Sequence, residues 1–258
     1  MSKHLKKSVY GSDDIEGFQP NPMQSFDTFV VGADNRFAYE AALAVAEDPA
    51  QLYNPLYIYG GSGLGKSHLM HAIVNHVKRK NASARIIHIT AEKLLAELIE
   101  YVKTNRVEAF REHYRHADFV LIDDIHYIAG KSETQRELLF TFDALVKKNT
   151  QVVISSTSII GGAERITEGL KSRFLGGLSI ELRAPDEKTR VAILRKRLES
   201  EGILVDDDIL VYIASVFQHD IRMLNGGLTC VIAHSLMLNK ELTLGIAKKV
   251  LGDKVNLR

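Results

Sequence analysis

Gly60-Gly61-Ser62-Gly63-Leu64-Gly65-Lys66-Ser67 is the stretch that decides the fold. It follows a hydrophobic run and opens an amphipathic helical pattern, which is the context that gives Gly-x-x-x-x-Gly-Lys-Ser its meaning. Glycines let backbone N–H groups wrap phosphate oxygens, and the helix that follows adds its N-terminal dipole. Lys66 would place a cation on the β and γ phosphates, and the Ser67 hydroxyl can coordinate magnesium. The stretch predicts a P-loop for ATP or ADP with Mg²⁺, in preference to a glycine-rich turn that merely closes a strand.

A partner motif begins at Phe119, where the apolar run Phe-Val-Leu-Ile ends in Asp123 and Asp124. A carboxylate at the end of a buried strand beside the phosphate loop can hold hydrated magnesium, and the next acid can orient or deprotonate the attacking water. We therefore expect Asp123 to take the metal and Asp124 the water. An apolar run with an acidic turn is a weak signal alone, but it is much stronger 57 residues after Lys66.

Short apolar runs alternate with longer amphipathic stretches on both sides of these motifs. The runs are residues 56–59, 85–90, 119–123, 151–156 and 178–182. Their near-continuous apolar character is typical of parallel strands covered by helices on both faces. Helical periods occupy residues 66–78, 91–101 and 106–114. We expect an α/β P-loop fold with a parallel five-stranded sheet flanked by helices.

The strand signal ends at Pro185, and a helical region follows. Asp186 is a plausible N-cap for a helix to Ser200, Gly202 would stop it, and three more helical patterns lie at 206–217, 220–238 and 243–251. The expected division is a flexible segment over 1–22, a nucleotide-binding domain over 23–184 and a small helical lid over 185–258.

Composition sets the class of protein. The chain has 258 residues, of which 45% are hydrophobic and 25% charged, as in globular proteins. Its net charge of +1 gives no sign of a nucleic-acid partner, so any DNA contact must be local. Its single cysteine, Cys230, cannot form an internal disulfide, and no stretch is typical of a signal peptide or a membrane span. We expect a soluble protein in the cytoplasm.

Hydrolysis also needs cations for the charge that builds on the γ-phosphate. Arg173 lies just before the last strand, where it could reach a neighbouring subunit, and Arg222 opens a lid helix, where it could fold back over the nucleotide. On spacing alone, each is more often an ordinary surface arginine.

The chain also carries a longer series of motifs in one order. They are Phe29-Val30-Val31-Gly32, Asn35-Arg36-Phe37-Ala38, residues 41–47, Tyr53 to Gly60, Leu121 to Ile125, Leu170-Lys171-Ser172-Arg173-Phe174 and Thr189 to Leu194. From Phe26 to Leu251 the chain resembles the ATPase core of the DnaA family, the bacterial replication initiators of the AAA+ class. Such a series is far more specific than a P-loop alone.

The resemblance implies roles for particular residues. Val31, Gly32 and His68 would join the phosphate loop in binding ATP, with Val31 and Gly32 near the adenine. Arg173 would be the finger inserted into the next subunit's site, and Arg222 would sense the γ-phosphate. When an arginine of the next subunit completes the ATP site, the subunits contact each other head to tail. A head-to-tail contact that does not close into a ring builds a helical filament, so an ATP-dependent helical filament is expected.

The resemblance also implies a DNA partner. In the family, the inner surface of the filament stretches one strand of the replication origin, and Ile99 and Lys131 fall at positions of such contacts. The alternatives are a buried helix residue for Ile99 and a solvated loop lysine for Lys131. The stretch from Ala91 to Tyr114 is similar to the helical insertion of initiators. The replicative helicase and regulators of initiation are further partners that the resemblance suggests.

Several positions depart from the family pattern. Thr157 and Ser158 replace an acid–arginine pair, Gly169 replaces an arginine, and Glu133 replaces a basic residue. The chain ends at Arg258 without the family's C-terminal helix-turn-helix domain, which indicates an excised core or a shortened relative. The leading hypothesis is an ATPase whose slow hydrolysis acts as a switch. The alternatives are a DnaA-related regulator that stimulates hydrolysis by the initiator, or a helicase-loader-like protein.

Overall fold

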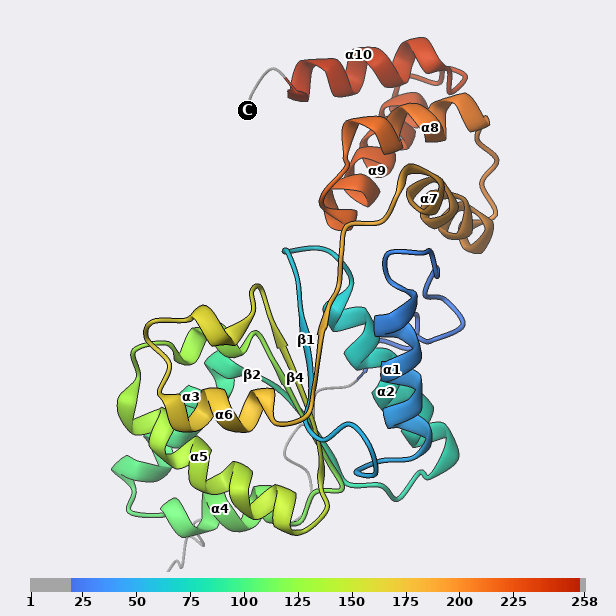
Figure 1. Ribbon diagram of the computed structural model, residues 1–258. Coiled ribbons are helices and arrows are strands. Elements are labelled where there is room, and N and C mark those ends of the chain that lie inside the picture. The colour runs from blue at the N-terminus through green and yellow to red at the C-terminus, as the bar shows by residue number, and fades with distance from the viewer. Residues whose placement is uncertain (1–19, 256–258) are drawn as a thin grey trace, which may run out of the picture.

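The computed structural model describes residues 20–255, and its centre is a five-stranded parallel sheet in the order β2-β3-β4-β1-β5 (Figure 1). The strands are β1 (Leu56–Tyr59), β2 (Ile86–Thr90), β3 (Phe119–Asp123), β4 (Gln151–Ser156) and β5 (Leu178–Glu181). Each neighbouring pair is parallel, so the carboxyl ends of all five strands lie at one edge of the sheet. In register, Leu56 of β1 lies opposite Val153 of β4 on one side and Leu178 of β5 on the other.

The strands are apolar on both faces because both faces are covered. In β3, Phe119 and Leu121 pack into one hydrophobic cluster, whereas Val120 and Ile122 pack into another on the opposite side. Alternate side chains of a strand point to opposite faces, so a run without polar residues is what a two-sided core requires.

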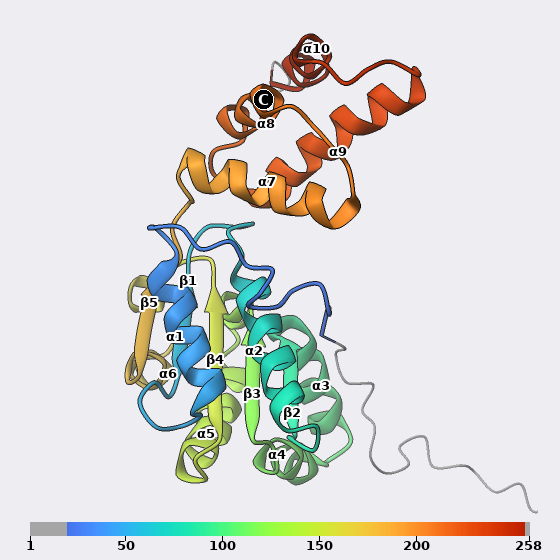
Figure 2. The ribbon, with the colours of Figure 1, turned by 90° about the vertical axis from the view of Figure 1, so that its right-hand side faces the viewer.

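Helices form the outer layers. They are α1 (Arg36–Glu47), α2 (Lys66–Lys80), α3 (Ala91–Lys103), α4 (Val107–Arg115), α5 (Ser132–Lys147) and α6 (Glu168–Leu175), with short 3₁₀ helices η1 (Ile125–Ile128) and η2 (Ile160–Gly162). Helices α1 and α2 cover one face, and α3 to α6 cover the other (Figures 1 and 2). This arrangement confirms the α/β P-loop fold expected from the sequence.

A helical bundle follows the sheet and stands over its carboxyl edge (Figures 1 and 2). It contains α7 (Glu187–Glu201), α8 (Asp207–Val216), α9 (Ile221–Met237) and α10 (Leu244–Val255), which share a hydrophobic cluster of their own. Asp186 caps α7 by accepting from the Thr189 N–H at 2.7 Å, and Gly202 ends that helix with a φ of +66°. The capping and stop signals in the sequence thus act as their chemistry predicts.

The observed ends of some strands and segments differ by a few residues from those expected from the sequence. Strand β5 ends at Glu181, although the next N–H, that of Leu182, still donates to the Tyr59 carbonyl at 2.6 Å. The expected flexible segment falls mostly outside the described residues, but Asn21 already donates its N–H to His71 Nδ1 at 3.0 Å. None of the helices within residues 20–255 is both long and apolar enough to cross a membrane.

Candidate functional site

The phosphate loop connects β1 to α2 at the carboxyl edge of the sheet. Two of its glycines have no room for a side chain. A Cβ on Gly60, at φ +155°, would lie 2.2 Å from the Leu182 carbonyl oxygen, and one on Gly63, at φ +72°, would lie 2.1 Å from the Asp220 carboxylate. The loop is therefore enclosed by Leu182, the residue after β5, on one side and by the start of α9 on the other.

Lys66 lies at the first position of α2 and is only 6% exposed. Its ammonium donates to the carbonyl oxygens of Gly60 and Gly61, each at 2.8 Å. Burial lowers the pKa of Lys66, and the carboxylates of Asp124 and Asp123 oppose that shift. The Lys66 ammonium is thus held inside the loop by hydrogen bonds that phosphate oxygens could replace. The two nearby carboxylates favour its charged form.

Ser67 and Asp123 meet across the loop, as a magnesium site requires. The Ser67 hydroxyl donates to Asp123 Oδ2 at 2.7 Å, and Asp123 is 8% exposed. A hydroxyl and a carboxylate oxygen in contact are ligands that suit Mg²⁺, which usually completes its octahedron with water and substrate phosphates. No cluster of three or more His, Cys, Asp or Glu side chains able to hold a metal lies within residues 20–255. These two residues fit a phosphate-dependent Mg²⁺ site.

Ser155, in β4, holds the two acids in place, a function that sequence reasoning missed. Its hydroxyl donates to Asp123 Oδ1 and accepts from the Asp124 N–H at 2.9 Å. Asp124 has a φ of +57°, a conformation that aspartate tolerates better than most residues. Its carboxylate is 41% exposed and lies close enough to Lys66 to raise the pKa of that residue. Asp124 is therefore the acid of the pair that solvent can reach.

The start of α9 contacts the phosphate loop directly. The Ile221 N–H donates to the Gly63 carbonyl at 3.0 Å, and Arg222 Nη2 donates to the Ser62 hydroxyl at 3.2 Å. Asp220 caps α9 by accepting from the N–H groups of Arg222 and Met223. The structure thus brings Arg222 together with the P-loop, although Arg222 lies 156 positions after Lys66 in the sequence.

Val31 and Gly32 lie on a short loop before α1 that a buried side chain organises. Asn35 accepts from the Gly32 N–H at 2.7 Å and donates to the Val30 carbonyl at 2.9 Å. A Cβ on Gly32 would lie 2.1 Å from the Thr189 hydroxyl of α7, so this loop also contacts the helical bundle. Sequence reasoning noted Asn35 only as part of a motif and assigned it no function.

His68 lies one residue beyond the phosphate loop, but its described contacts are with the segment before α1. Its Nε2 is 3.0 Å from the Ser25 carbonyl, and its ring meets Phe29 edge to face with centroids 5.2 Å apart. Burial lowers the pKa of His68, which favours the neutral ring. These contacts anchor the N-terminal segment on α2.

Arg173 lies on α6 and is not brought to its own chain's phosphate loop by any described contact within residues 20–255. Its guanidinium binds Asp143 of α5 through two hydrogen bonds, at 2.9 and 3.2 Å. That carboxylate raises the pKa of Arg173, and the side chain is 44% exposed. The arginine is therefore presented on the surface by an acid of its own subunit.

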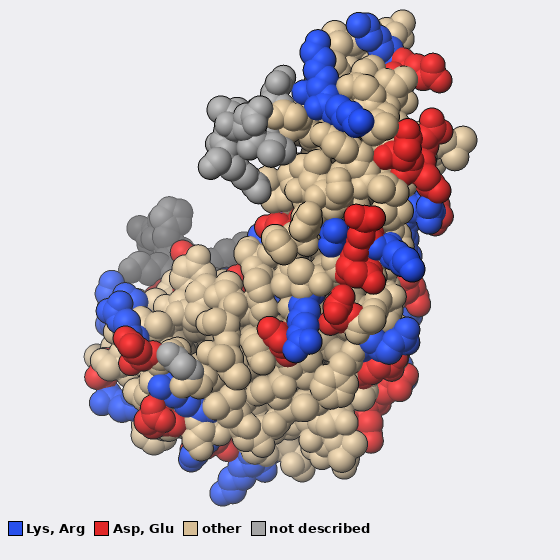
Figure 3. Space-filling view, turned by 45° about the horizontal axis from the view of Figure 1, so that its top comes forward, with Lys and Arg blue, Asp and Glu red and all other residues tan. Residues whose placement is uncertain are grey.

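Ile99 and Lys131 both face solvent. Ile99 of α3 is 44% exposed, so the alternative of a buried helix residue is wrong. Lys131 is exposed and directly precedes α5. The surface in Figure 3 intersperses basic and acidic side chains and shows no broad field of one sign, which agrees with the net charge of +1.

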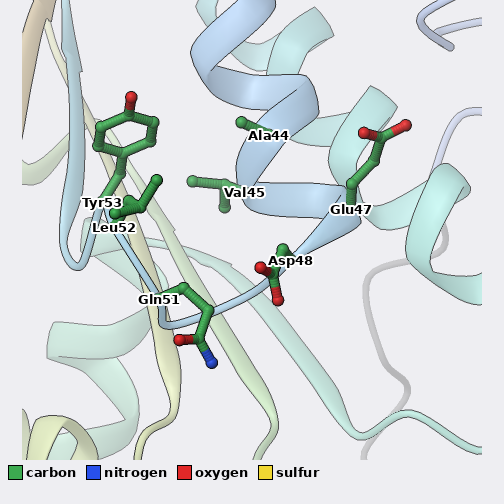
Figure 4. A pocket seen from close by; sticks show the side chains of 7 residues that line it. All are labelled: Ala44, Val45, Glu47, Asp48, Gln51, Leu52 and Tyr53. Atoms are coloured by element: carbon green, nitrogen blue, oxygen red, sulfur yellow. The ribbon is translucent and has the colours of Figure 1, made fainter.

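A separate hollow of about 170 Å³ lies between the end of α1 and the loop that leads to β1 (Figure 4). Val45, Leu52 and Tyr53 contribute apolar side chains, and Glu47 and Asp48 contribute acids. Since these residues precede β1 and the phosphate loop follows it, the hollow lies at the opposite edge of the sheet. It takes no part in the nucleotide site.

Comparison with known proteins finds one family and several solved relatives. The family model for the bacterial DnaA ATPase domain matches residues 21–181. Domain III of the replication initiation protein DnaA from Thermotoga maritima is 39% identical, with a TM-score of 0.87, over 92% of this chain and 98% of that one. AMPPCP-bound DnaA from Aquifex aeolicus is 30% identical, with a TM-score of 0.77, over 82% of this chain and 65% of that one. A replication initiator DnaA bound to AMPPCP and single-stranded DNA is 28% identical, with a TM-score of 0.79, over 89% of this chain and 69% of that one.

Proposed function

The chain belongs to the bacterial DnaA ATPase domain family, and we propose that it is the module by which ATP controls assembly of a replication initiator. One observation carries the proposal: Lys66 contacts the phosphate loop from α2, and Arg222 contacts it from α9. A nucleotide in that loop would therefore meet cations from both the sheet and the helical bundle. This arrangement supports a site that distinguishes ATP from ADP by its third phosphate.

Each residue of the site has a proposed task. Lys66 and the loop N–H groups bind the phosphates, while Ser67 and Asp123 hold Mg²⁺, which when bound neutralises charge on the phosphate oxygens. Asp124 orients the attacking water, since it is the exposed acid of the pair. The AMPPCP complexes of related DnaA proteins support binding of ATP and ADP.

Val31 and Gly32 are proposed to contact the adenine. Asn35 fixes the backbone on which they lie, and Thr189 packs against Gly32 from the helical bundle. The base and the phosphates would then each contact both parts of the chain. The separate hydrophobic cluster of α7 to α10 supports treating residues 185–258 as a lid on a nucleotide-binding domain over 23–184.

Arg173 is proposed to act in the site of a neighbouring subunit. Its pairing with Asp143, away from its own phosphate loop, supports this, because an isolated subunit then lacks one cation for the transition state. Hydrolysis by the single subunit would be slow, and ATP would serve as a switch. A site completed by the next subunit gives a heterologous contact, which builds a helical filament when its rotation does not close.

Single-stranded origin DNA is the proposed ligand of that filament. The relative solved with single-stranded DNA supports it, as does the exposure of Ile99 and Lys131 at positions that the family resemblance assigns to DNA contact. The exposed ammonium of Lys131 would contact the phosphate backbone of that strand. The helical pair α3–α4 would set the pitch of the filament.

The test is whether nucleotide controls DNA binding. Fluorescence anisotropy of a labelled oligothymidine should show tighter binding with ATP and Mg²⁺ than with ADP and Mg²⁺. Equal binding in both nucleotide states would contradict the initiator module and would favour the regulator or the helicase-loader-like protein.

A further inference from the structure

Two loops at the carboxyl edge of the sheet are fastened to each other beside α5. One follows η1 and contains Gly130, and the other follows η2 and contains Arg165. The Gly130 N–H donates to the Arg165 carbonyl at 2.8 Å, and the side chain of Gln135 donates to that same carbonyl at 2.8 Å. Gln135 is 2% exposed and also accepts from the Thr167 N–H at 2.7 Å. The loops are thus held by the backbone of Arg165 and a buried amide, and the guanidinium is not needed for this.

The guanidinium of Arg165 instead packs against Gly130, the residue directly before Lys131. A Cβ on Gly130 would be 3.0 to 3.2 Å from its Nη2, Nε and Cζ atoms. Arg165 and Lys131 are both exposed. Arg165 thus packs on the residue directly before Lys131, and the two exposed cations belong to a pair of loops that hydrogen bonds join.

Within the described residues, neither Arg165 nor Lys131 has a carboxylate within salt-bridge distance, although Glu164 is next to Arg165 in the sequence. The nearby charges on α5 cancel, because Glu133 binds Arg136 at 2.5 Å. A guanidinium and an ammonium with free donors form a good site for a phosphate, which the planar guanidinium can bind with two parallel hydrogen bonds.

From this geometry we propose that Arg165 and Lys131 together bind a phosphodiester group of single-stranded nucleic acid. The inference rests on the proposed function and extends it, because nothing in the family pattern assigns Arg165. It also explains how the surface can bind DNA although Glu133 stands where related proteins usually carry a basic residue. Here the second cation comes from the loop after β4.

The test uses the whole chain with ATP and Mg²⁺ and labelled oligothymidine. Arg165→Ala should weaken binding about 3- to 10-fold at moderate salt and reduce the slope of log K against log salt by about 0.7, the value for loss of one single-strand phosphate contact. Arg165→Lys should recover part of the affinity. Lys147→Ala is the matched control, since it removes an exposed cation at the other end of α5 and should change neither quantity.

The substitution should leave the fold intact, because alanine keeps the carbonyl that binds Gly130 and Gln135. An unchanged melting temperature and ATP affinity would verify this. Wild-type DNA affinity and slope in Arg165→Ala would overturn the inference while leaving the proposed function standing. An equal loss of affinity for polyglutamate would also overturn it, since the pair would then bind acidic protein. If the wild-type chain failed to bind oligothymidine at all, both proposals would fall.

Discussion

Replacing Arg222 with alanine is expected to weaken ATP binding about tenfold and to leave ADP binding nearly unchanged. Arg222 reaches the phosphate loop from α9, where its Nη2 is 3.2 Å from the Ser62 hydroxyl. A hydrogen bond between a cation and a phosphate contributes about 1.5 to 3 kcal/mol, and the exposure of this side chain places it at the lower end. About 1.4 kcal/mol corresponds to a factor of ten in affinity. ADP lacks the third phosphate, so the effect should be selective.

A fluorescence titration with labelled ATP and ADP measures both affinities. Met223→Ala is the matched control, because Met223 is the exposed neighbour whose backbone N–H, not its side chain, contacts Asp220. Ser62→Ala should have little effect, since it removes only the contact between the loop and Arg222. If Arg222→Ala lowered the affinities for ATP and ADP by the same factor, Arg222 would be stabilising the lid and not sensing the γ-phosphate.

Two further predictions concern the buried side chains of Lys66, in α2, and His88, in β2. Lys66→Ala should abolish tight ATP binding, because the loop loses the cation that lies between Gly60 and Gly61; an unchanged affinity in a nucleotide titration would refute the P-loop assignment. Burial lowers the pKa of His88 from 6.5 to about 4, so between these pH values the unfolded chain takes up a proton that the folded chain does not. The free energy of unfolding should therefore fall by about 3 kcal/mol through this residue as the pH drops from 6.5 to 4. In His88→Gln, the free energy of unfolding measured by chemical denaturation should lack that part of the pH dependence. The same dependence on pH in both proteins would contradict this effect of His88.

The local elements could be predicted because their signals are local. The run from Phe119 to Asp123 is a strand with those bounds, and Asp186 and Gly202 begin and end α7 as their cap and stop chemistry indicates. The two-sided burial of β3 follows from the same apolar run. Periodicity and capping are properties of a few neighbouring residues, so a single sequence contains them.

The contacts between elements could not be predicted, because they depend on the order of the strands. Ser155 reaches Asp123 only because β4 is paired with β3, and no local pattern gives that pairing. Gln135 likewise binds loops that follow two different strands. The sequence indicated both Arg173 and Arg222 as candidate cations for the γ-phosphate. In the structure Arg222 contacts the phosphate loop of its own chain, whereas Arg173 binds Asp143.

If ATP joins subunits through Arg173, light scattering of the chain should show larger particles with ATP and Mg²⁺ than with ADP and Mg²⁺. Arg173→Ala should bind ATP normally but lose ATP-dependent assembly. Asp143→Asn, which releases Arg173 from its own subunit, should assemble at least as well as the wild type. Assemblies of Arg173→Ala as large as those of the wild-type chain would contradict a role of Arg173 in joining subunits.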